Sequence, residues 1–298
     1  MEWEGRVAVV TGGTRGVGAG IARAFLRAGA EVLVCARRPP ERPVAHGGRQ
    51  ARFLPVDLRD TAAVRRFFDQ VADRCGRLDT LVNNAGGTPR RPLGEGGPER
   101  HARVVELNLL APLTASLAAY EQLRAARGSV VMTGSVSGTR PSPGTAAYGA
   151  AKAGLESLAR SMAVEWAPEV RVNTLVLGMV RTELSALHYG DADGVTAVER
   201  TVPLGRLAEP DEIGDAALFL ASDRATYISG ASLLVHGGGE RPAFLDAATA
   251  GRRQETAGAP AVRRNETAGA PAVRRNETAG APAVRRNETV NRQEGSTG

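Results

Sequence analysis

Short runs of Val- and Leu-rich residues recur along the chain, and each is followed by a longer stretch of helical period. Polar and apolar residues do not alternate within the runs, which is typical of strands buried on both faces of a parallel sheet. The predicted strands are Arg6–Val10, Glu31–Ala36, Ala51–Val56, Thr80–Val82, Ser129–Thr133, Val170–Leu177 and Ala231–Val235. The predicted helices are Gly18–Ala28, Ala62–Arg74, Glu99–Ala126, Ala146–Trp166 and Asp211–Ala221. This alternation predicts an α/β fold with one Rossmann-type, doubly wound parallel sheet and helices on both faces.

The C-terminal segment has a different character. Three consecutive copies of ETAGAPAVRRN occupy residues 255–265, 266–276 and 277–287. Each copy contains Gly, Pro and a single Val, so little apolar surface is available to offset the entropy cost of ordering. We expect a domain over 1–245 and a disordered tail over 246–298. The repeated arginine pairs leave binding to nucleic acid or an anionic surface as an alternative, although the tail has no aromatic residue for base stacking.

Composition excludes several other classes of protein. The net charge of +6 belongs mainly to the arginines of the tail, so it does not by itself indicate a nucleic-acid partner. The two cysteines, Cys35 and Cys75, form no metal-ligand motif, so we expect no metal. We find no signal peptide and no run of 18 apolar residues, and we therefore expect a cytoplasmic chain without a membrane partner.

A glycine-rich segment directly after the first strand is the first candidate for chemistry. Thr11–Gly18 reads TGGTRGVG and opens the first helix. Glycines at these positions permit a tight turn and a close approach of the backbone, so that a pyrophosphate can lie at the helix N-terminus. The residues expected to contact a dinucleotide here are Gly12, Thr14, Arg15, Gly16, Val17 and Gly18.

The end of the second strand is expected to select the nicotinamide cofactor. An acidic residue there would bind the ribose 2′-hydroxyl of NAD, but this chain has Cys35-Ala36-Arg37-Arg38. Arg37, together with Arg15, is suited to hold a 2′-phosphate. NADP(H) is therefore favoured over NAD(H), and the alternative is that both arginines are simply solvated.

Lys152 is the only lysine among the 38 basic residues of the chain. It follows Tyr148 by four residues, which places both side chains on one face of a helix. A compact ammonium beside a phenol lowers the phenol's pKa, and the phenol can then serve as a proton donor or acceptor. The alternative is one surface lysine that has no role.

Together these segments resemble the classical short-chain dehydrogenase/reductase (SDR) family over residues 5–240. The family's TGxxxGxG, NNAG and YxxxK motifs are matched by Thr11–Gly18, Asn83–Gly86 and Tyr148–Lys152, in the family's order. The resemblance implies hydride transfer between a nicotinamide cofactor and a carbonyl/alcohol pair.

The resemblance also implies a role for individual residues. Tyr148 is expected to be the catalytic acid/base, and Lys152 to hold the nicotinamide ribose and lower the pKa of the tyrosine. Ser135 is expected to bind the substrate carbonyl, with Ser137 as a rival at a less suitable spacing. Asn108 is expected to hold a water in a proton relay behind the lysine.

Further cofactor contacts are implied by the same resemblance. They are expected from Asp57, Leu58, Asn84, Ala85, Gly86, Val180 and Thr182. Two residues depart from the family's pattern. Leu177 stands where proline is usual, which is expected to loosen the loop that follows, and His236 stands where aspartate is common.

The sequence does not identify the substrate beyond a small carbonyl or alcohol compound. Its selection is expected from Glu183–Leu204, whose mixed polarity and glycines predict a mobile lid. The resemblance implies a homo-oligomer, a tetramer or dimer, with the helices Glu99–Ala126 and Ala146–Trp166 at one interface. The alternatives are an NAD-dependent alcohol dehydrogenase and a non-catalytic NADP(H)-sensing protein.

Overall fold

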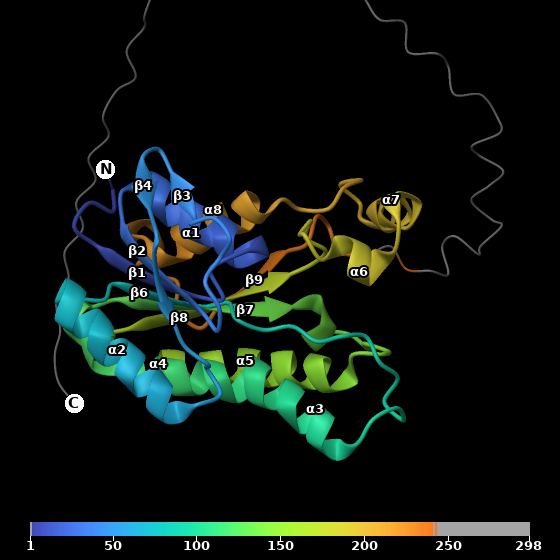
Figure 1. Ribbon diagram of the computed structural model, residues 1–298, viewed down its shortest axis with the longest axis horizontal. Coiled ribbons are helices and arrows are strands. Elements are labelled where there is room, and N and C mark those ends of the chain that lie inside the picture. The colour runs from blue at the N-terminus through green and yellow to red at the C-terminus, as the bar shows by residue number, and fades with distance from the viewer. Residues whose placement is uncertain (1, 241, 243–298) are drawn as a thin grey trace, which may run out of the picture. The chain divides into compact units, whose positions relative to one another are not determined.

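Seven parallel strands form the central sheet of the computed structural model, in the order β5-β2-β1-β6-β7-β8-β9 (Figure 1). The structure describes residues 2–240 and 242, so the predicted disorder of the tail and the predicted boundary at 245 lie outside the described residues. The strands of this sheet are β1 (Val7–Thr11), β2 (Glu31–Ala36), β5 (Arg52–Pro55), β6 (Thr80–Asn83), β7 (Ser129–Ser135), β8 (Arg171–Leu177) and β9 (Ser232–Val235). A short antiparallel hairpin is formed by β3 (Ala45–His46) and β4 (Arg49–Gln50).

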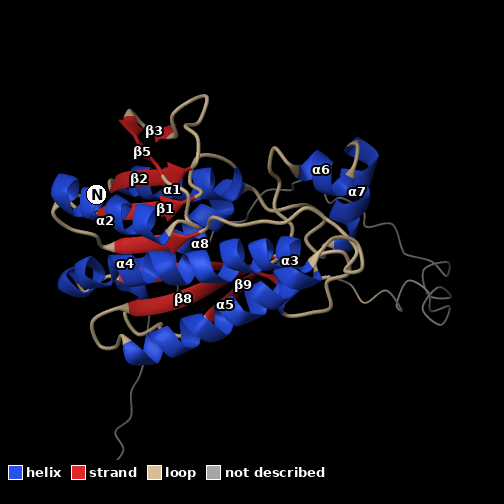
Figure 2. Ribbon diagram, turned by 60° about the horizontal axis from the view of Figure 1, so that its bottom comes forward, coloured by secondary structure: helices blue, strands red, loops and turns tan. Residues whose placement is uncertain are grey.

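Two layers of helices cover the sheet (Figures 1 and 2). One face is covered by α1 (Gly16–Ala28) and α8 (Pro210–Ala221), and the other by α2 (Thr61–Cys75), α4 (Ala111–Ala126) and α5 (Ala146–Glu165). Beyond the carboxyl ends of the strands lie α3 (Pro98–Val105), α6 (Ser185–Tyr189) and α7 (Ala192–Thr201). The shorter turns are a π-helical turn, Glu106–Leu110, and 3₁₀ turns at Val136–Gly138 and Asp223–Ala225.

Burial on both faces explains why the strands lack a polar side. All five residues of β1 are buried, and successive side chains enter opposite cores. Val7 and Val9 pack with α2, α4 and α5, whereas Ala8 and Val10 pack with α1 and α8. The predicted doubly wound α/β fold is confirmed, and the predicted strands and helices begin and end within two residues of the observed ones.

Three features were not predicted. The β3–β4 hairpin is too short to produce a periodic pattern. The predicted helix Glu99–Ala126 is interrupted by the π-helical turn, and the predicted lid contains α6 and α7. By length and composition alone, the continuous helical stretch Pro98–Ala126 could cross a membrane, but core helices pass the same test, and its buried residues Ala115, Ala119 and Leu123 belong to the core.

Close packing between α1 and α8 fixes the position of the glycine-rich loop that precedes α1. The two helices approach through glycines: a Cβ added to Gly20 would lie 2.2 Å from the Pro210 carbonyl oxygen. In the same way, a Cβ on Gly214 would lie 2.5 Å from the Gly20 carbonyl oxygen. The two helices can therefore approach this closely only because Gly20 and Gly214 have no side chain.

The substitution Gly20→Ala should destabilise the protein in spite of alanine's better helix propensity, because the added methyl group must displace backbone. Overpacking of this kind costs about 1–3 kcal/mol. Urea unfolding measures the loss. Gly94→Ala is the matched control, since a Cβ there meets nothing within 4 Å. Equal stability of the two variants would contradict the packing account.

Candidate active site

A cavity of about 710 Å³ opens at the carboxyl ends of the central strands. This volume is in the range of sites that hold a small molecule or cofactor. Every residue predicted to bind the cofactor lines it, and so do Ser135, Tyr148 and Lys152. Asn108 is the one predicted site residue that does not line the cavity, because it is fully buried. The sequence-based selection of residues thus converges on one place, as a doubly wound sheet requires.

The glycine-rich loop lines the cavity at the N-terminus of α1. Gly16 adopts a φ of +51°, in the left-handed region that favours glycine. A Cβ on Gly18 would lie 2.3 Å from the Gly12 carbonyl oxygen and 2.5 Å from the Asn84 amide nitrogen. The side chain of Arg15, the N-cap residue of α1, forms no capping hydrogen bond. Glycine at position 18 therefore allows the loop to pack tightly on itself and on Asn84 at the wall of the cavity, and the N–H groups of the loop suit a pyrophosphate.

Thr11 and Asn84 hold this loop against the end of β6. The Thr11 hydroxyl oxygen accepts hydrogen bonds from the backbone N–H groups of Asn84 and Ala85, both at 3.0 Å. The Asn84 side-chain amide donates to the Thr11 carbonyl oxygen at 2.9 Å and to the Gly12 carbonyl oxygen at 3.2 Å. Motifs more than 70 residues apart in the sequence are thereby joined across the sheet.

Ser135 and Tyr148 meet at the opposite end of the cavity. Ser135 is the last residue of β7, and Tyr148 lies in the first turn of α5. Burial raises the pKa of Tyr148, and the hydrogen bond with the Ser135 side chain lowers it in part. Ser137, the rival of Ser135, is not among the residues that line the cavity, and its backbone N–H donates to the Ser135 hydroxyl at 3.2 Å.

Lys152 is buried one turn further along α5, with 2 % of its surface exposed. Its ammonium donates a hydrogen bond to the Thr133 carbonyl oxygen at 2.7 Å and lies 5.6 Å from the centroid of the Tyr148 ring. Burial lowers the pKa of Lys152 to about 8. Burial keeps the pKa of Tyr148 above its ordinary value, and the lowering of this pKa by Lys152 stays a prediction.

Asn108 sits in the π-helical turn and is fully buried. Its Oδ1 accepts from the Gly87 N–H at 2.9 Å, and its Nδ2 donates to the carbonyl oxygens of Gly87 and Val104 at 3.0 and 2.9 Å. A Cβ on Gly86 would lie 2.5 Å from Asn108 Oδ1 and 3.4 Å from Lys152 Nζ. Asn108 therefore orders the backbone beside the lysine, and its role in a water relay stays a prediction.

The guanidinium groups of Arg15 and Arg37 line the cavity near the end of β2 and are exposed. Within the described part of the chain, neither guanidinium forms a hydrogen bond or ion pair with another side chain. Asp57 lies beside them and forms an ion pair with Arg59 at 2.6 Å. Arg59 was not among the site residues predicted from the sequence. The hydrogen bond from Arg59 lowers the pKa of Asp57 to about 2, and Arg37 adds to this effect.

The loop after β8 is well supported despite its departure from the family's pattern. Leu177 is buried and pairs with Val235 of β9, and the loosening expected from the missing proline stays a prediction. A Cβ on Gly178 would lie 2.7 Å from the His236 Cβ, which indicates that His236 packs against the loop. Val180 forms a parallel bridge with Ala208.

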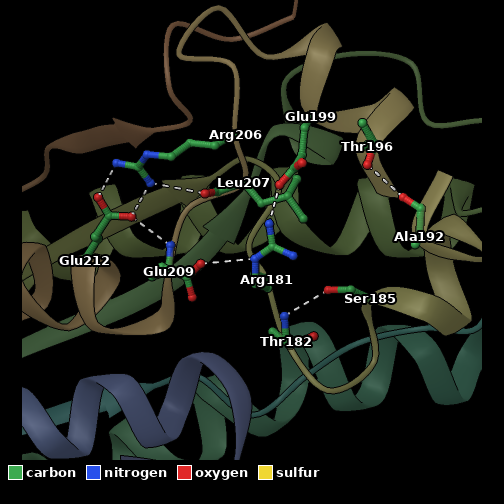
Figure 3. A network of polar contacts seen from close by, with 10 residues as sticks. All are labelled: Arg181, Thr182, Ser185, Ala192, Thr196, Glu199, Arg206, Leu207, Glu209 and Glu212. Carbon is green, nitrogen blue, oxygen red and sulfur yellow. Dashed lines mark hydrogen bonds and ion pairs between the residues drawn. The ribbon is translucent and has the colours of Figure 1, made fainter. Parts of the chain in front are cut away.

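Arg181 ties this loop to the segment predicted to select the substrate (Figure 3). Its guanidinium pairs with Glu199 of α7, and its Nε donates to Glu209 at 3.1 Å. The neighbouring Thr182 N–H donates to the Ser185 hydroxyl at 2.9 Å. The loop that lines the cavity is thus linked to α6, α7 and the start of α8 by short polar contacts.

Glu183 makes a contact that the sequence did not indicate. Its carboxylate accepts a hydrogen bond from the Gly16 N–H at 3.3 Å, at the N-terminus of α1. A negative charge is favourable there because of the partial positive charge of the helix terminus. The carboxylate occupies the position at which the glycine-rich loop is suited to hold a pyrophosphate.

Comparison with known proteins identifies the family. A family model described as enoyl-(acyl carrier protein) reductase matches residues 12–240. The chain belongs to the short-chain dehydrogenase/reductase family. As an SDR enzyme it is an oxidoreductase that acts on CH–OH groups with a nicotinamide cofactor, NAD(P)(H).

Two curated SDR relatives and one solved structure illustrate the similarity. The L-fucose dehydrogenase of Oryctolagus cuniculus is 36% identical over 245 residues, which cover 80% of this chain and 86% of the relative. The cis-4-hydroxycyclohexanecarboxylate dehydrogenase of Sinomonas cyclohexanicum is 37% identical over 240 residues, 78% of this chain and 96% of the relative. A putative short-chain alcohol dehydrogenase from Sinorhizobium meliloti superposes with a TM-score of 0.74 at 34% identity, covering 80% of this chain and 97% of the other.

The buried charge of Lys152 should reduce the stability of this SDR enzyme near neutral pH. With its pKa lowered from 10.5 to about 8, the folded protein binds fewer protons than the unfolded chain between these two values. Stability therefore rises with pH across this window. Lys152→Met should raise the free energy of unfolding at pH 7 by about 1–3 kcal/mol, and the gain should shrink as the pH approaches 10.5.

Urea unfolding of Lys152→Met at several pH values measures this difference. Arg160→Met, an exposed position on the same helix, controls for loss of a positive charge. A gain that is independent of pH, or equal in the two variants, would show that the cost does not come from burial of the lysine's charge.

Removal of the Glu183 charge should strengthen cofactor binding, because the carboxylate competes with a pyrophosphate for the N-terminus of α1. Glu183→Gln should lower the dissociation constant of NADP⁺ several-fold at low salt, with a smaller gain at high salt. Isothermal titration calorimetry measures both values, with the exposed Glu165→Gln as control. Weaker binding by Glu183→Gln would mean that the glutamate supports the cofactor.

Proposed function

We propose that this SDR enzyme is an NADP(H)-dependent oxidoreductase that interconverts a ketone or aldehyde and an alcohol through Ser135, Tyr148, Lys152 and Asn108. The observation that carries the proposal is the convergence of Ser135, Tyr148 and Lys152 on one end of a cavity whose other end is the glycine-rich loop. A hydroxyl, a phenol and an ammonium in this arrangement suit a carbonyl oxygen on which negative charge develops.

The residues present fit a nicotinamide dinucleotide. The glycine-rich loop, whose Gly12 and Gly18 line the cavity, is suited to its pyrophosphate. Thr133 also lines the cavity, and its buried hydroxyl has no hydrogen-bond partner in the described structure. Lys152 would hold the nicotinamide ribose, and Val180 and Thr182 would contact the carboxamide. When bound, the cofactor supplies or accepts the hydride.

The protein's own groups would handle the proton and the orientation of the substrate. During reduction, the Tyr148 hydroxyl would give its proton to the substrate oxygen, and Ser135 would hold that oxygen by a hydrogen bond. The ammonium of Lys152 would favour the ionised phenol once the proton has left. Asn108 orders the backbone next to the lysine. In this proposal it also holds a water molecule through which a proton returns to Tyr148.

NADP(H) is favoured because two uncommitted guanidinium groups flank the expected position of the adenosine ribose. Arg15 and Arg37 could both reach a 2′-phosphate, and the two residues directly after β2 are arginines and not carboxylates. The nearby carboxylate of Asp57 is paired with Arg59. If Arg15 and Arg37 instead remain solvated, the enzyme is an NAD-dependent alcohol dehydrogenase.

A homo-oligomer is supported by the apolar surface of the helices on one face of the sheet. Leu110 and Leu117, at the start of and within α4, and Val164 of α5 are exposed by 49%, 60% and 79%. Exposed leucine and valine on adjacent helices suit burial against a second copy of the chain.

Tyr148→Phe should reduce kcat/KM at least about 100-fold, since the substrate oxygen would lose its proton donor. The change keeps the ring and removes only the hydroxyl, so the affinity for NADP⁺ should stay within a few-fold of that of the unaltered enzyme. Turnover of a ketone panel with NADPH, followed by absorbance, measures the first value, and calorimetry the second. Retained turnover would contradict the assignment of Tyr148 as the proton donor.

Arg37→Ser should weaken NADP⁺ binding about ten- to hundredfold, the value of one charge-assisted hydrogen bond, and leave NAD⁺ binding nearly unchanged. Parallel titrations with the two cofactors give both constants. Arg38→Ser is the matched control, because Arg38 is exposed and is not among the residues that line the cavity. Equal losses for both cofactors would favour the NAD-dependent alternative.

A further inference from the structure

A second group of basic side chains lines the cavity, away from the loop that is suited to the pyrophosphate. Arg91, Arg100 and His101 come from the loop after β6 and the start of α3. They lie outside the segment Glu183–Leu204, in which the sequence analysis expected the substrate contacts. The structure thus gives the cavity a wall that this expectation did not include.

Backbone contacts place Arg91 near Tyr148. The Arg91 N–H donates to the Gly144 carbonyl oxygen at 2.7 Å, and the cavity is lined continuously from Gly144 to Tyr148. A Cβ on Gly96 would lie 3.4 Å from the Arg100 Cδ and 3.5 Å from the Arg91 Cδ. The stems of the two arginines therefore lie side by side over Gly96.

Two nitrogen atoms of this group are buried without a hydrogen-bond partner. They are Arg91 Nε and His101 Nε2. A buried donor without a partner is costly, and both residues line the cavity, so this arrangement favours a ligand that supplies an acceptor. The Arg91 guanidinium is always charged, and its planar fork matches the two oxygens of a carboxylate or phosphate.

The charges around the cavity favour an anion. Among the described residues that line it, seven are arginine or lysine and two are carboxylates. Both carboxylates have other contacts: Asp57 pairs with Arg59, and Glu183 accepts from the Gly16 N–H. The acidic residues of the segment itself, Glu95 and Glu99, are not among the lining residues. Among the described residues that line the cavity, no carboxylate pairs with Arg91 or Arg100.

We propose that the substrate carries an acidic group, a carboxylate or a phosphate, and that Arg91, Arg100 and His101 bind it while the reacting carbonyl or alcohol faces Tyr148. This proposal rests on the proposed function, since it assigns the substrate class of the same site. Arg91 is a specificity-determining residue in this account, and the hydride and proton transfers do not pass through it.

Unreactive probes test the proposal without turnover. Benzoate, phenyl phosphate and benzamide share one ring and differ in charge, and each is titrated calorimetrically into the full-length protein saturated with NADP⁺. We expect benzoate or phenyl phosphate to bind at least ten times more tightly than benzamide. The anion that binds more tightly indicates whether the acidic group of the substrate is a carboxylate or a phosphate. Arg91→Met should remove this preference, and Arg65→Met, an exposed position on α2, should retain it.

Several outcomes would overturn the proposal. They are equal affinity for benzamide and the anions, no binding of either anion at millimolar concentration, an undiminished preference in Arg91→Met, and a loss of NADP⁺ affinity in that variant. The last would mean that Arg91 reads the cofactor. Tyr148→Phe should keep the preference for anions, so failure of the catalytic assignment and failure of the anion site are distinguishable. Circular dichroism of Arg91→Met checks its fold.

Discussion

The buried ammonium of Lys152 is the contact on which the arrangement of the site depends. Its hydrogen bond to the Thr133 carbonyl oxygen joins α5 to the end of β7. Gly86, which follows β6, lies against Asn108, because a Cβ there would lie 2.5 Å from Asn108 Oδ1, and Asn108 holds the adjoining backbone in place. One charged group therefore fixes the relative positions of the strand ends and of the helix that carries Tyr148.

Burial of the Lys152 ammonium lowers the stability of the folded protein and places the charge next to Tyr148. A buried ammonium with one carbonyl partner is costly, and the same burial lowers its pKa. The same burial raises the pKa of Tyr148, so the phenol remains protonated and available as a donor. The positive charge along the rest of the cavity suits anionic ligands at both ends. The stability cost thus arises from Lys152, whereas the affinity for anions is assigned to the arginines that line the cavity.

Much of this could be predicted from the sequence because it depends on local patterns. Uninterrupted apolar runs identify the strands, and the spacing of Tyr148 and Lys152 places both on one turn of a helix. The unpredicted features depend on contacts between distant segments. Glu183 reaches Gly16 across 167 residues, and Arg91 is held by Gly144. The raised pKa of Tyr148 likewise follows from burial, which no spacing reveals.

The chain's single lysine permits a direct test of the central contact. In protein labelled with ¹³C at the lysine ε-carbon, the only labelled side chain is that of Lys152, so its titration can be followed by NMR without assignment. A buried ammonium predicts a midpoint near pH 8 in the folded protein and near 10.5 in the urea-unfolded chain. A midpoint near 10.5 in both states would contradict the buried charge and the account of the site built on it.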